Sequence, residues 1–399
     1  MKTELRKFIK KLRGEIKQSD LLFSLRRNFI DKDLKRERKN MKKCTLKSKK
    51  QIAREIKDYK DHWKCIPHDY IRYGLFDKQL TREEILDYIP MHYYYCDFYN
   101  EIFADIEKKS SREDYIKEKF PLTHQILNSF PTNVYKAIGK GRNLSDKLLQ
   151  YLMFKEKNIP VPTVSGVIYA DKVYDTHGKE TNFKNILDKL SHSKKIFLKP
   201  TDGCGGSGIT VLINENGIFK HNGKQVNSLS DLNLNGAQVY IAQEALSQHK
   251  DLAAINSSSV NTLRTIVRYA DGQPEIIGII LRMGRKDSHV DNSHMGGFSV
   301  GIDLKDGKFF KQGGHEHGGG VYDRHPDTGY IFNGNGISDW SQTISQIKEI
   351  VSKINEYPLS GWDIAIGKDG IKAIEFNMGF GIEHAQTILG GMRRQLLIK

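Results

Sequence analysis

The pattern of hydrophobic and polar positions divides the chain into two parts. Up to residue 125, apolar residues recur at helical spacing among many charges, and Thr81-Arg82-Glu83-Glu84 opens a helix with a capping-box pattern. From residue 161 onward, short apolar or alternating runs between glycine- and proline-rich turns are typical of strands. The pattern predicts a helical N-terminal region followed by an α+β body.

Residues 143–160 join these two parts. Their apolar positions predict a helix that is capped by Ser145 and ends at Asn158, just before an Ile-Pro pair. Lys147 falls in the first turn of this helix, where its charge opposes the helix dipole. A nearby anionic ligand would give a reason for that placement.

Two predicted strands enclose a glycine-rich turn. The strands cover residues 196–198 and 209–213, Lys199 ends the first, and the turn spans residues 203–208. Such a turn can lay its backbone N–H groups on phosphates, because no Cβ blocks the approach. A strand follows the last glycine, which excludes a dinucleotide fingerprint, and the absence of Gly-Lys-Ser/Thr excludes a P-loop. On its own, the turn is explained equally well as a plain flexible hairpin.

Arginines and acidic residues fall on strands in the second half. Alternation over residues 260–269 places Arg264 on one strand face, and the next strand carries Arg282. Residues 362–377 predict a hairpin with an Asp-Gly turn.

A three-residue loop in that hairpin would set Asp363 opposite Glu375, and Asn377 would share their face. Two carboxylates and an amide oxygen suit Mg²⁺ bound to phosphates. The alternative is a polar face in water. The apolar neighbours argue against it, because buried unpaired carboxylates are costly.

Composition adds an expected location. The 399 residues are 38% hydrophobic, and no apolar run reaches the roughly 18 residues of a membrane-spanning helix. The first residues lack the apolar core of a signal peptide, and the four cysteines have neither metal-ligand nor disulfide-framework spacing. We expect a cytoplasmic protein.

The net charge of +15 is concentrated in a basic arm, residues 1–60, which holds 22 Lys and Arg against 8 Asp and Glu and so carries +14. Apolar residues at roughly helical spacing favour an amphipathic helix on an anionic membrane surface, or one packed on the protein's own body. Nucleic acid is the least favoured partner, because aromatic residues are not interleaved with the basic ones. Membrane binding by the arm would make the protein peripheral at the inner face of the membrane.

Taken together, Lys147, the strands and turn over 196–213, Arg264 and the hairpin over 362–377 resemble the ATP-grasp family, from about residue 143 to the C-terminus. In that family, ATP lies between two α+β subdomains. The resemblance implies this fold, with a helical region over residues 1–125, a small subdomain with the glycine flap over 126–245, and a C-terminal subdomain with the metal and substrate site over 246–399.

The resemblance also implies roles for individual residues. Lys147 and Lys199 would touch the phosphates of ATP. Mg²⁺ would be held by Asp363, Glu375 and Asn377. Arg264 and Arg282 would stabilise the transferred group. The other ATP contacts would come from a flap of Gly205, Gly206, Ser207 and Gly208 and from a hinge of Gln243, Glu244, Ala245 and Leu246. The acceptor pocket would be shaped by Asn292, Gly296 and Gly297.

Several motifs are most similar to the sugar-transfer-associated branch of the family: Lys-Pro-x-x-Gly-x-x-Gly-x-Gly, Asn-Thr-Leu-Arg, Asn-x-x-x-Gly-Gly and Glu-Phe-Asn. The last motif continues Met-Gly-Phe-Gly, without the proline common elsewhere in the family. This branch implies a carboxylate–amine ligase that works through an acyl phosphate on small molecules, in making surface polysaccharide from sugar or amino-sugar building blocks. Two alternatives stay open: a kinase that phosphorylates a hydroxyl, and a non-enzymatic nucleotide-binding scaffold docked on a membrane.

Overall fold

The computed structural model describes residues 112–138, 144–203, 206–270, 272–285, 288, 291, 296–315, 321–355, 357, 359–378, 380–392 and 395. The basic arm and its predicted membrane contact lie outside the described residues. Within the described part of the chain, no helix is long and apolar enough to cross a membrane.

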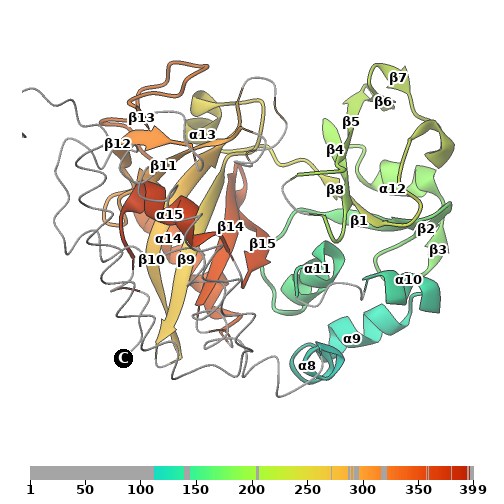
Figure 1. The fold of residues 1–399 in the computed structure, drawn as a ribbon. Helices are drawn as coiled ribbons and strands as arrows, with labels where there is room; N and C mark the ends of the chain where they lie inside the picture. The colour runs from blue at the N-terminus through green and yellow to red at the C-terminus, as the bar shows by residue number, and fades with distance from the viewer. Residues whose placement is uncertain are drawn as a thin grey trace, which may run out of the picture.

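Eight strands form an antiparallel sheet, here called the small sheet, in the order β3-β2-β1-β8-β4-β5-β6-β7 (Figure 1). The strands are β1 (Val164–Tyr169), β2 (Lys172–Tyr174), β3 (Glu180–Thr181), β4 (Lys195–Pro200), β5 (Thr210–Glu215), β6 (Ile218–His221), β7 (Lys224–Gln225) and β8 (Val239–Glu244). Leu198 and Ala242 share a core with α12 (Phe183–Lys189), which packs on one face. Because side chains alternate along a strand, Lys199 belongs to the other face.

The predicted strands around the glycine turn are confirmed. They are β4 and β5, which pair antiparallel from Lys195↔Ile213 to Leu198↔Thr210. Gly206 and Gly208 have φ of +80° and +73°, a region that L side chains rarely adopt, so glycine is needed at both positions.

Seven strands form the large sheet, again antiparallel, in the order β13-β12-β11-β10-β9-β14-β15. The strands are β9 (Thr262–Ala270), β10 (Gln273–Met283), β11 (Phe298–Ile302), β12 (Phe309–Gly314), β13 (Val321–Tyr322), β14 (Leu359–Gly367) and β15 (Gly370–Asn377). The two sheets confirm the predicted α+β class.

Helices cover the two faces of the large sheet. On one face, the Tyr269 hydroxyl donates to the Val351 carbonyl of α14 (Trp340–Ser352). On the other face, a Cβ at Gly278 would lie 2.5 Å from Leu389 of α15 (Ile382–Leu389), so the helix can approach only because this residue is glycine. Arg264 shares the α15 face, because Ile280, two residues beyond Gly278, pairs with Arg264.

Among the described residues, four of the remaining helices precede the small sheet in the sequence: α8 (Arg112–Lys119), α9 (Pro121–Asn128), α10 (Thr132–Ile138) and α11 (Lys147–Glu156). The 3₁₀ turn Leu229–Asp231 joins β7 to β8, and α13 (Lys250–Ile255) lies between β8 and β9 in the sequence. Figure 1 shows α11 between the small sheet and β15. Glu156 at the end of α11 accepts hydrogen bonds from Thr123 N and Oγ1, at 2.8 and 2.7 Å, which fixes α9 against it. Helix α11 contacts both α9 and strand β15 of the large sheet.

The ends of α11 differ from those predicted. Asp146, rather than Ser145, is the N-cap, and its carboxylate accepts from the N–H groups of Leu148 and Leu149 at 2.9 and 3.0 Å. A carboxylate directly before the first helical residue reaches these N–H groups and also suits the positive end of the dipole. The helix ends at Glu156, and Asn158 is left-handed with φ of +52°.

The C-terminal hairpin forms, but its predicted three-residue loop is wrong. Gly367 pairs with Gly370 across a two-residue turn, which Gly370 permits with φ of +112°. Taken alone, this turn would have moved Asp363 out of register with Glu375. A bulge at Ile374 restores the predicted pair Asp363↔Glu375.

Candidate active site

A cluster of two arginines and one aspartate lies on one face of the large sheet. Arg264 on β9 pairs in register with Asp363 on β14, and its Nε and Nη2 donate to Oδ1 and Oδ2 at 2.6 and 3.1 Å. Arg282 on β10 donates from Nη1 to both oxygens at 3.1 Å. Burial would raise the pKa of Asp363, but the two guanidinium charges outweigh it and lower the pKa below its usual value.

Asp291 is a second carboxylate of this cluster, and it was not among the residues selected from the sequence. It accepts from the backbone N of Thr262 at 3.0 Å and from the Thr262 hydroxyl, and Oδ1 lies 3.8 Å from Arg282 Nη2. Burial raises its pKa more than Arg282 lowers it. Its place in the sequence, directly before Asn292, is the one signal that could have identified it.

Two lysines approach from the side of the small sheet. Lys147 is the first residue of α11, and its Nζ donates to the Gly203 carbonyl at the start of the glycine turn. Its backbone N donates to the Thr201 carbonyl at 2.9 Å. Lys199 on β4 donates from Nζ to Gln243 Oε1 at 2.7 Å. Burial and then the charge of Lys147 lower the pKa of Lys199 to about 8.

The charges of the two sheets act on one another. Glu375 and Asp291, both from the large-sheet half, oppose the fall in the pKa of Lys199 on the small sheet. Burial disfavours the charge of Arg282, yet Asp363, Asp291 and Glu375 together raise its pKa. A direct contact also joins the two halves here, because Glu244, next to the hydrogen-bond partner of Lys199, lies 2.9 Å from Lys372 Nζ on β15. We refer to these side chains as the charged cluster between the sheets.

The predicted metal ligands lie on this same face. Glu375 pairs with Asp363 and Asn377 pairs with Gly361, and both side chains are partly exposed. Among the described residues, no group of three or more His, Cys, Asp or Glu is arranged to hold a metal, and the predicted set has only two carboxylates. Oxygen donors of this kind fit Mg²⁺. Asp363, however, has both oxygens engaged by arginines, whereas the side chains of Glu375 and Asn377 have no hydrogen bond among the described residues.

The predicted hinge begins with the last two residues of β8, Gln243 and Glu244, and Glu244 serves a structural purpose within it. Its carboxylate lies 2.9 Å from Lys372 Nζ on the large sheet and 3.3 Å from His192, and it accepts from Thr163 N at 2.8 Å. Ala245 N donates to the Lys195 carbonyl at 3.1 Å, and Leu246 is partly exposed. The Glu244 carboxylate and the backbone N–H groups of Glu244 and Ala245 are therefore all occupied.

The predicted flap is open to solvent where it is described. Ser207 and Gly208 are exposed, Gly206 is partly exposed, and Gly205 lies outside the described residues. Of the predicted acceptor residues, Asn292 also lies outside them. Gly296 has φ of +84° and open space around it.

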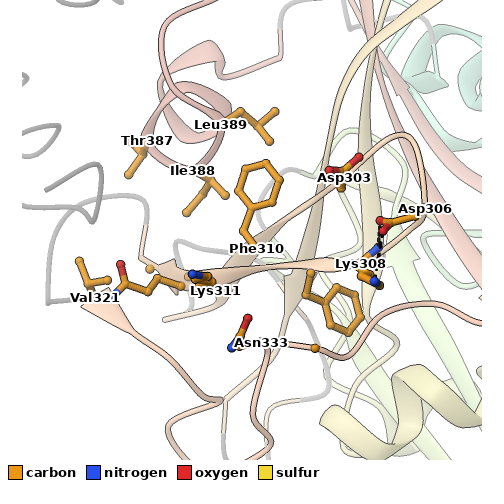
Figure 2. Close-up of a pocket in the computed structure, with 15 residues that line it drawn as sticks. Asp303, Asp306, Lys308, Phe310, Lys311, Val321, Asn333, Thr387, Ile388 and Leu389 are labelled. Atoms are coloured by element: carbon orange, nitrogen blue, oxygen red, sulfur yellow. Dashed lines mark hydrogen bonds and ion pairs between the residues drawn. The ribbon is translucent and has the colours of Figure 1, made fainter. Parts of the chain in front are cut away.

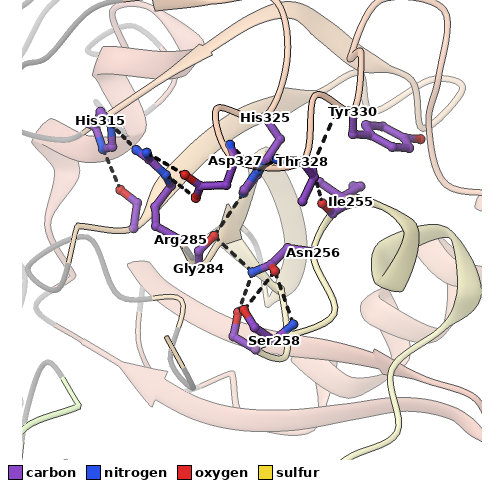
Figure 3. A network of polar contacts seen from close by, with 12 residues as sticks. Ile255, Asn256, Ser258, Gly284, Arg285, His315, His325, Asp327, Thr328 and Tyr330 are labelled. Atoms are coloured by element: carbon purple, nitrogen blue, oxygen red, sulfur yellow. Dashed lines mark hydrogen bonds and ion pairs between the residues drawn. The ribbon is translucent and has the colours of Figure 1, made fainter. Parts of the chain in front are cut away.

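Figure 3 shows a polar network beyond the end of β10, and the Gly297 carbonyl belongs to it through His315. This carbonyl lies 3.0 Å from His315 Nδ1, and His315 Nε2 lies 3.2 Å from Arg285, which forms a bidentate pair with Asp327 at 2.6 and 3.0 Å. Burial lowers the pKa of His325, whose Nε2 lies 3.0 Å from the Gly284 carbonyl. The network fixes the chain just after Arg282.

A cavity of about 630 Å³ opens elsewhere, between β12, α15 and the loop at Asn333 (Figure 2). The partly exposed ring of Phe310 and the side chain of Lys311 line it. It contains none of the residues predicted for the site. It is therefore distinct from the charged cluster between the sheets.

Comparisons with known proteins agree with the motifs. The profile of the family described as sugar-transfer associated ATP-grasp matches residues 132–395. No match is found among the curated proteins.

Similar solved structures include D-alanyl-alanine synthetase A from Vibrio cholerae O1, which is 13% identical with a TM-score of 0.30 and aligns over 62% of this chain and 60% of its own. A biotin carboxylase complex from Campylobacter jejuni is 12% identical with a TM-score of 0.35, over 70% and 48%. The N5-carboxyaminoimidazole synthase of Aspergillus clavatus, with ADP and its ribonucleotide, is 12% identical with a TM-score of 0.34, over 66% and 54%. The chain thus spans about half to three-fifths of these proteins, and likenesses at this level do not extend to activity.

The family profile begins in α10, covers every strand of both sheets and includes the charged cluster between them. That span is well over half of the sequence, so the chain belongs to the sugar-transfer associated ATP-grasp family.

Proposed function

We propose that this protein is an ATP- and Mg²⁺-dependent ligase that joins a carboxylate to an amine through an acyl phosphate. The observation that carries the proposal is the placement of Lys147 and Lys199 at the base of the glycine flap, with the helix that Lys147 begins hydrogen-bonded to β15 between Glu375 and Asn377. Cations from one side and oxygen ligands from the other are what a triphosphate and its metal require.

In the proposed complex, Lys147 and Lys199 contact the phosphates of ATP, and the glycine flap closes over them. Both lysines already lie at the base of that flap, because Lys147 contacts Gly203 and Lys199 ends β4. The segment 243–246 contacts the base and ribose. Glu375 and Asn377 would hold Mg²⁺, which would supply positive charge against that of the phosphates.

The substrate carboxylate attacks the γ-phosphorus, and ADP leaves. The amine then attacks the acyl carbon and gives a tetrahedral oxyanion, which Arg282 stabilises. The C–O bond then breaks, inorganic phosphate leaves with the former carboxylate oxygen, and the departing phosphate takes the proton that the amine loses. The Nε of Arg282 is buried with no hydrogen-bond partner within the described part of the chain, while Nη1 donates to Asp363. Arg264 acts beside it, oriented by the same carboxylate.

The deciding experiment is a hydroxylamine trap with ATP, Mg²⁺ and a panel of carboxylic acids. Hydroxamate formation that depends on one acid supports the ligase. A stable phosphoester without hydroxamate would instead identify a kinase. Nucleotide binding with no Mg²⁺-dependent turnover on any substrate would leave only the scaffold, and the proposal would be wrong.

For the substrate, we propose a sugar acid, or an amino acid that is joined to an amino sugar, in the making of surface polysaccharide. The support is the family's association with sugar transfer. The panel should therefore contain uronic acids and amino acids in separate sets. Turnover of simple fatty acids alone would contradict this part.

The basic arm is proposed to hold the protein on anionic lipid at the cytoplasmic face, because it carries +14 of the net charge. Deletion of residues 1–60 is expected to abolish salt-sensitive binding to vesicles that contain phosphatidylglycerol. Binding that is unchanged by the deletion would contradict this role.

A further inference from the structure

The side chain of Gln150 on α11 is fully enclosed, with 2% of its surface exposed. Its Nε2 donates to the carbonyls of Phe376 and Leu144, both at 2.7 Å, and its Oε1 accepts from the Phe376 N–H at 2.9 Å. Every hydrogen-bonding atom of this amide except one lone pair on Oε1 is therefore used. Such complete pairing indicates a fixed side chain, because a buried amide that lost these partners could not form hydrogen bonds to water instead.

The hydrogen bonds of Gln150 reach Phe376 at the open edge of the large sheet. Phe376 lies on β15, the last strand in the order of the large sheet, with Glu375 on one side of it and Asn377 on the other. A strand at the end of a sheet presents N–H and C=O groups that no further strand pairs. The Gln150 amide takes both groups of Phe376, as the backbone of another strand would.

Gln150 lies one helical turn after Lys147, so the amide connects a phosphate-binding lysine to the strand of the metal ligands. Other contacts also join α11 and its C-terminal extension to this sheet. Phe154 stacks on Trp362 with ring centroids 5.6 Å apart, and Ala373 N donates to the Pro160 carbonyl at 2.8 Å. Loss of the amide should therefore free β15 at Phe376 without detaching the helix.

We propose that Gln150 is a positioning residue, which holds Glu375 and Asn377 at a fixed distance from Lys147 by pairing its amide with the open edge of β15 at Phe376. This role toward the metal rests on the proposed function. The pairing itself does not, so the two parts can be tested separately.

The test compares Gln150→Leu with Leu149→Ala in the full-length protein. Leu keeps the approximate volume of Gln without its hydrogen bonds, whereas Leu149→Ala weakens the same helix at a fully buried position and leaves the amide in place. Gln150→Asn, shorter by one methylene, serves as a milder variant if Gln150→Leu does not fold. Amide hydrogen exchange across 371–378 is measured first, and then the Mg²⁺ concentration that gives half-maximal ATP turnover.

Gln150→Leu is expected to speed exchange at the Phe376 amide far more than exchange in β9, and to raise the half-maximal Mg²⁺ concentration by about 10- to 100-fold, the range typical of groups that orient metal ligands. In Leu149→Ala, exchange at the Phe376 amide and the half-maximal Mg²⁺ concentration should each stay within about twofold of the wild type. The reason is that β15 keeps its contact with the Gln150 amide in this variant.

Unchanged exchange at the Phe376 amide in Gln150→Leu would contradict the pairing of Gln150 with β15. An equal rise in the half-maximal Mg²⁺ concentration in both variants would mean that Gln150 only stabilises the fold in general. If the wild-type protein shows no Mg²⁺-dependent turnover, the proposed function fails and the role toward the metal fails with it. The exchange result then still decides whether Gln150 holds β15.

Discussion

Lys199 donates a hydrogen bond to Gln243 across the β4–β8 pair, with 2.7 Å between Nζ and Oε1. The surroundings disfavour its charge: burial and then Lys147 lower the pKa of Lys199 to about 8, and Glu375 and Asp291 offset only part of that effect. Bound phosphates would favour the charged ammonium again. Nucleotide binding is therefore linked to one proton.

We expect the affinity for ATP to fall as the pH rises above about 8. Below that pH, Lys199 already carries its proton and affinity is level. Above it, the free protein must first take up a proton, so the Kd rises roughly tenfold per pH unit until the pKa of the complex is reached. Titration calorimetry between pH 7 and pH 9.5, in buffers of different ionisation enthalpy, measures both the Kd and the proton uptake.

Lys199→Arg is the control for this pH dependence. A guanidinium keeps its charge throughout the range, so the variant should bind without proton uptake and with a level Kd. Wild-type protein with the same Kd at both ends of the range would show that Lys199 does not contact the phosphates.

The Asp363 carboxylate should contribute strongly to stability. Asp363→Asn removes the charge that balances Arg264 and Arg282, whose side chains are only 16% and 7% exposed. Breaking a buried pair of this kind costs about 3–5 kcal/mol, because uncompensated charge stays inside. Urea unfolding at neutral pH measures the loss.

Glu275→Gln makes the same change from carboxylate to amide in a neighbouring ion pair. Glu275 is paired with Arg268 but is 53% exposed, so a loss of no more than about 1 kcal/mol is expected. Similar losses in the two variants would mean that the Arg264–Asp363–Arg282 cluster is not held tightly in the folded protein.

Features that depend on neighbours in sequence could be predicted. The glycine turn, the helix with Lys147 in its first turn and the C-terminal hairpin all follow from local periodicity and turn residues. The pair Asp363↔Glu375 was predicted by way of the wrong loop. The two-residue turn and the bulge at Ile374 cancel in register, and the alternation of residues does not encode either of them.

Features that depend on distant neighbours could not be predicted. Gln150 and Phe376 lie 226 positions apart, and Arg264 and Asp363 lie 99 apart. The sequence predicted Asp363 as a metal ligand, but only the order of the strands places it between two arginines. Asp291 was missed for the same reason, because Thr262 and Arg282 reach it from two other parts of the chain.

In the hinge, the Glu244 carboxylate is expected to contribute little to the affinity for ATP. Glu244→Gln should change the Kd for ATP by less than about threefold, because Lys372, Thr163 and His192 already occupy this carboxylate. It should instead cost stability. Burial raises the pKa of Glu244, but the Thr163 N–H and Lys372 outweigh it and lower the pKa overall.

The stabilisation from Glu244 should therefore be present above the ordinary pKa of a glutamate and be lost as the pH falls through the lowered value. Urea unfolding of the wild type and Glu244→Gln at pH 7 and at pH 3 measures this difference. A large loss of ATP affinity with no loss of stability would assign the carboxylate to the nucleotide instead.

Glu375 should have the opposite profile, a small effect on stability and a large one on turnover. Its side chain is partly exposed, and unlike Asp363 it accepts no arginine hydrogen bond among the described residues. Glu375→Gln should lower Mg²⁺-dependent turnover by more than about 100-fold, since even groups that only orient a metal ligand contribute 10- to 100-fold. ATP binding without Mg²⁺ should persist.

The same substitution should also act on Lys199, because Glu375 opposes the fall in its pKa. Without that carboxylate the pKa of Lys199 drops further, and the decline of ATP affinity with pH should begin below 8 rather than at it. Ser207→Ala, in the exposed part of the flap, should leave this onset unchanged. Full turnover in Glu375→Gln would remove the metal site, whereas lost turnover with an unshifted pH onset would separate Glu375 from the phosphate-binding lysine and contradict a single cluster between the two sheets.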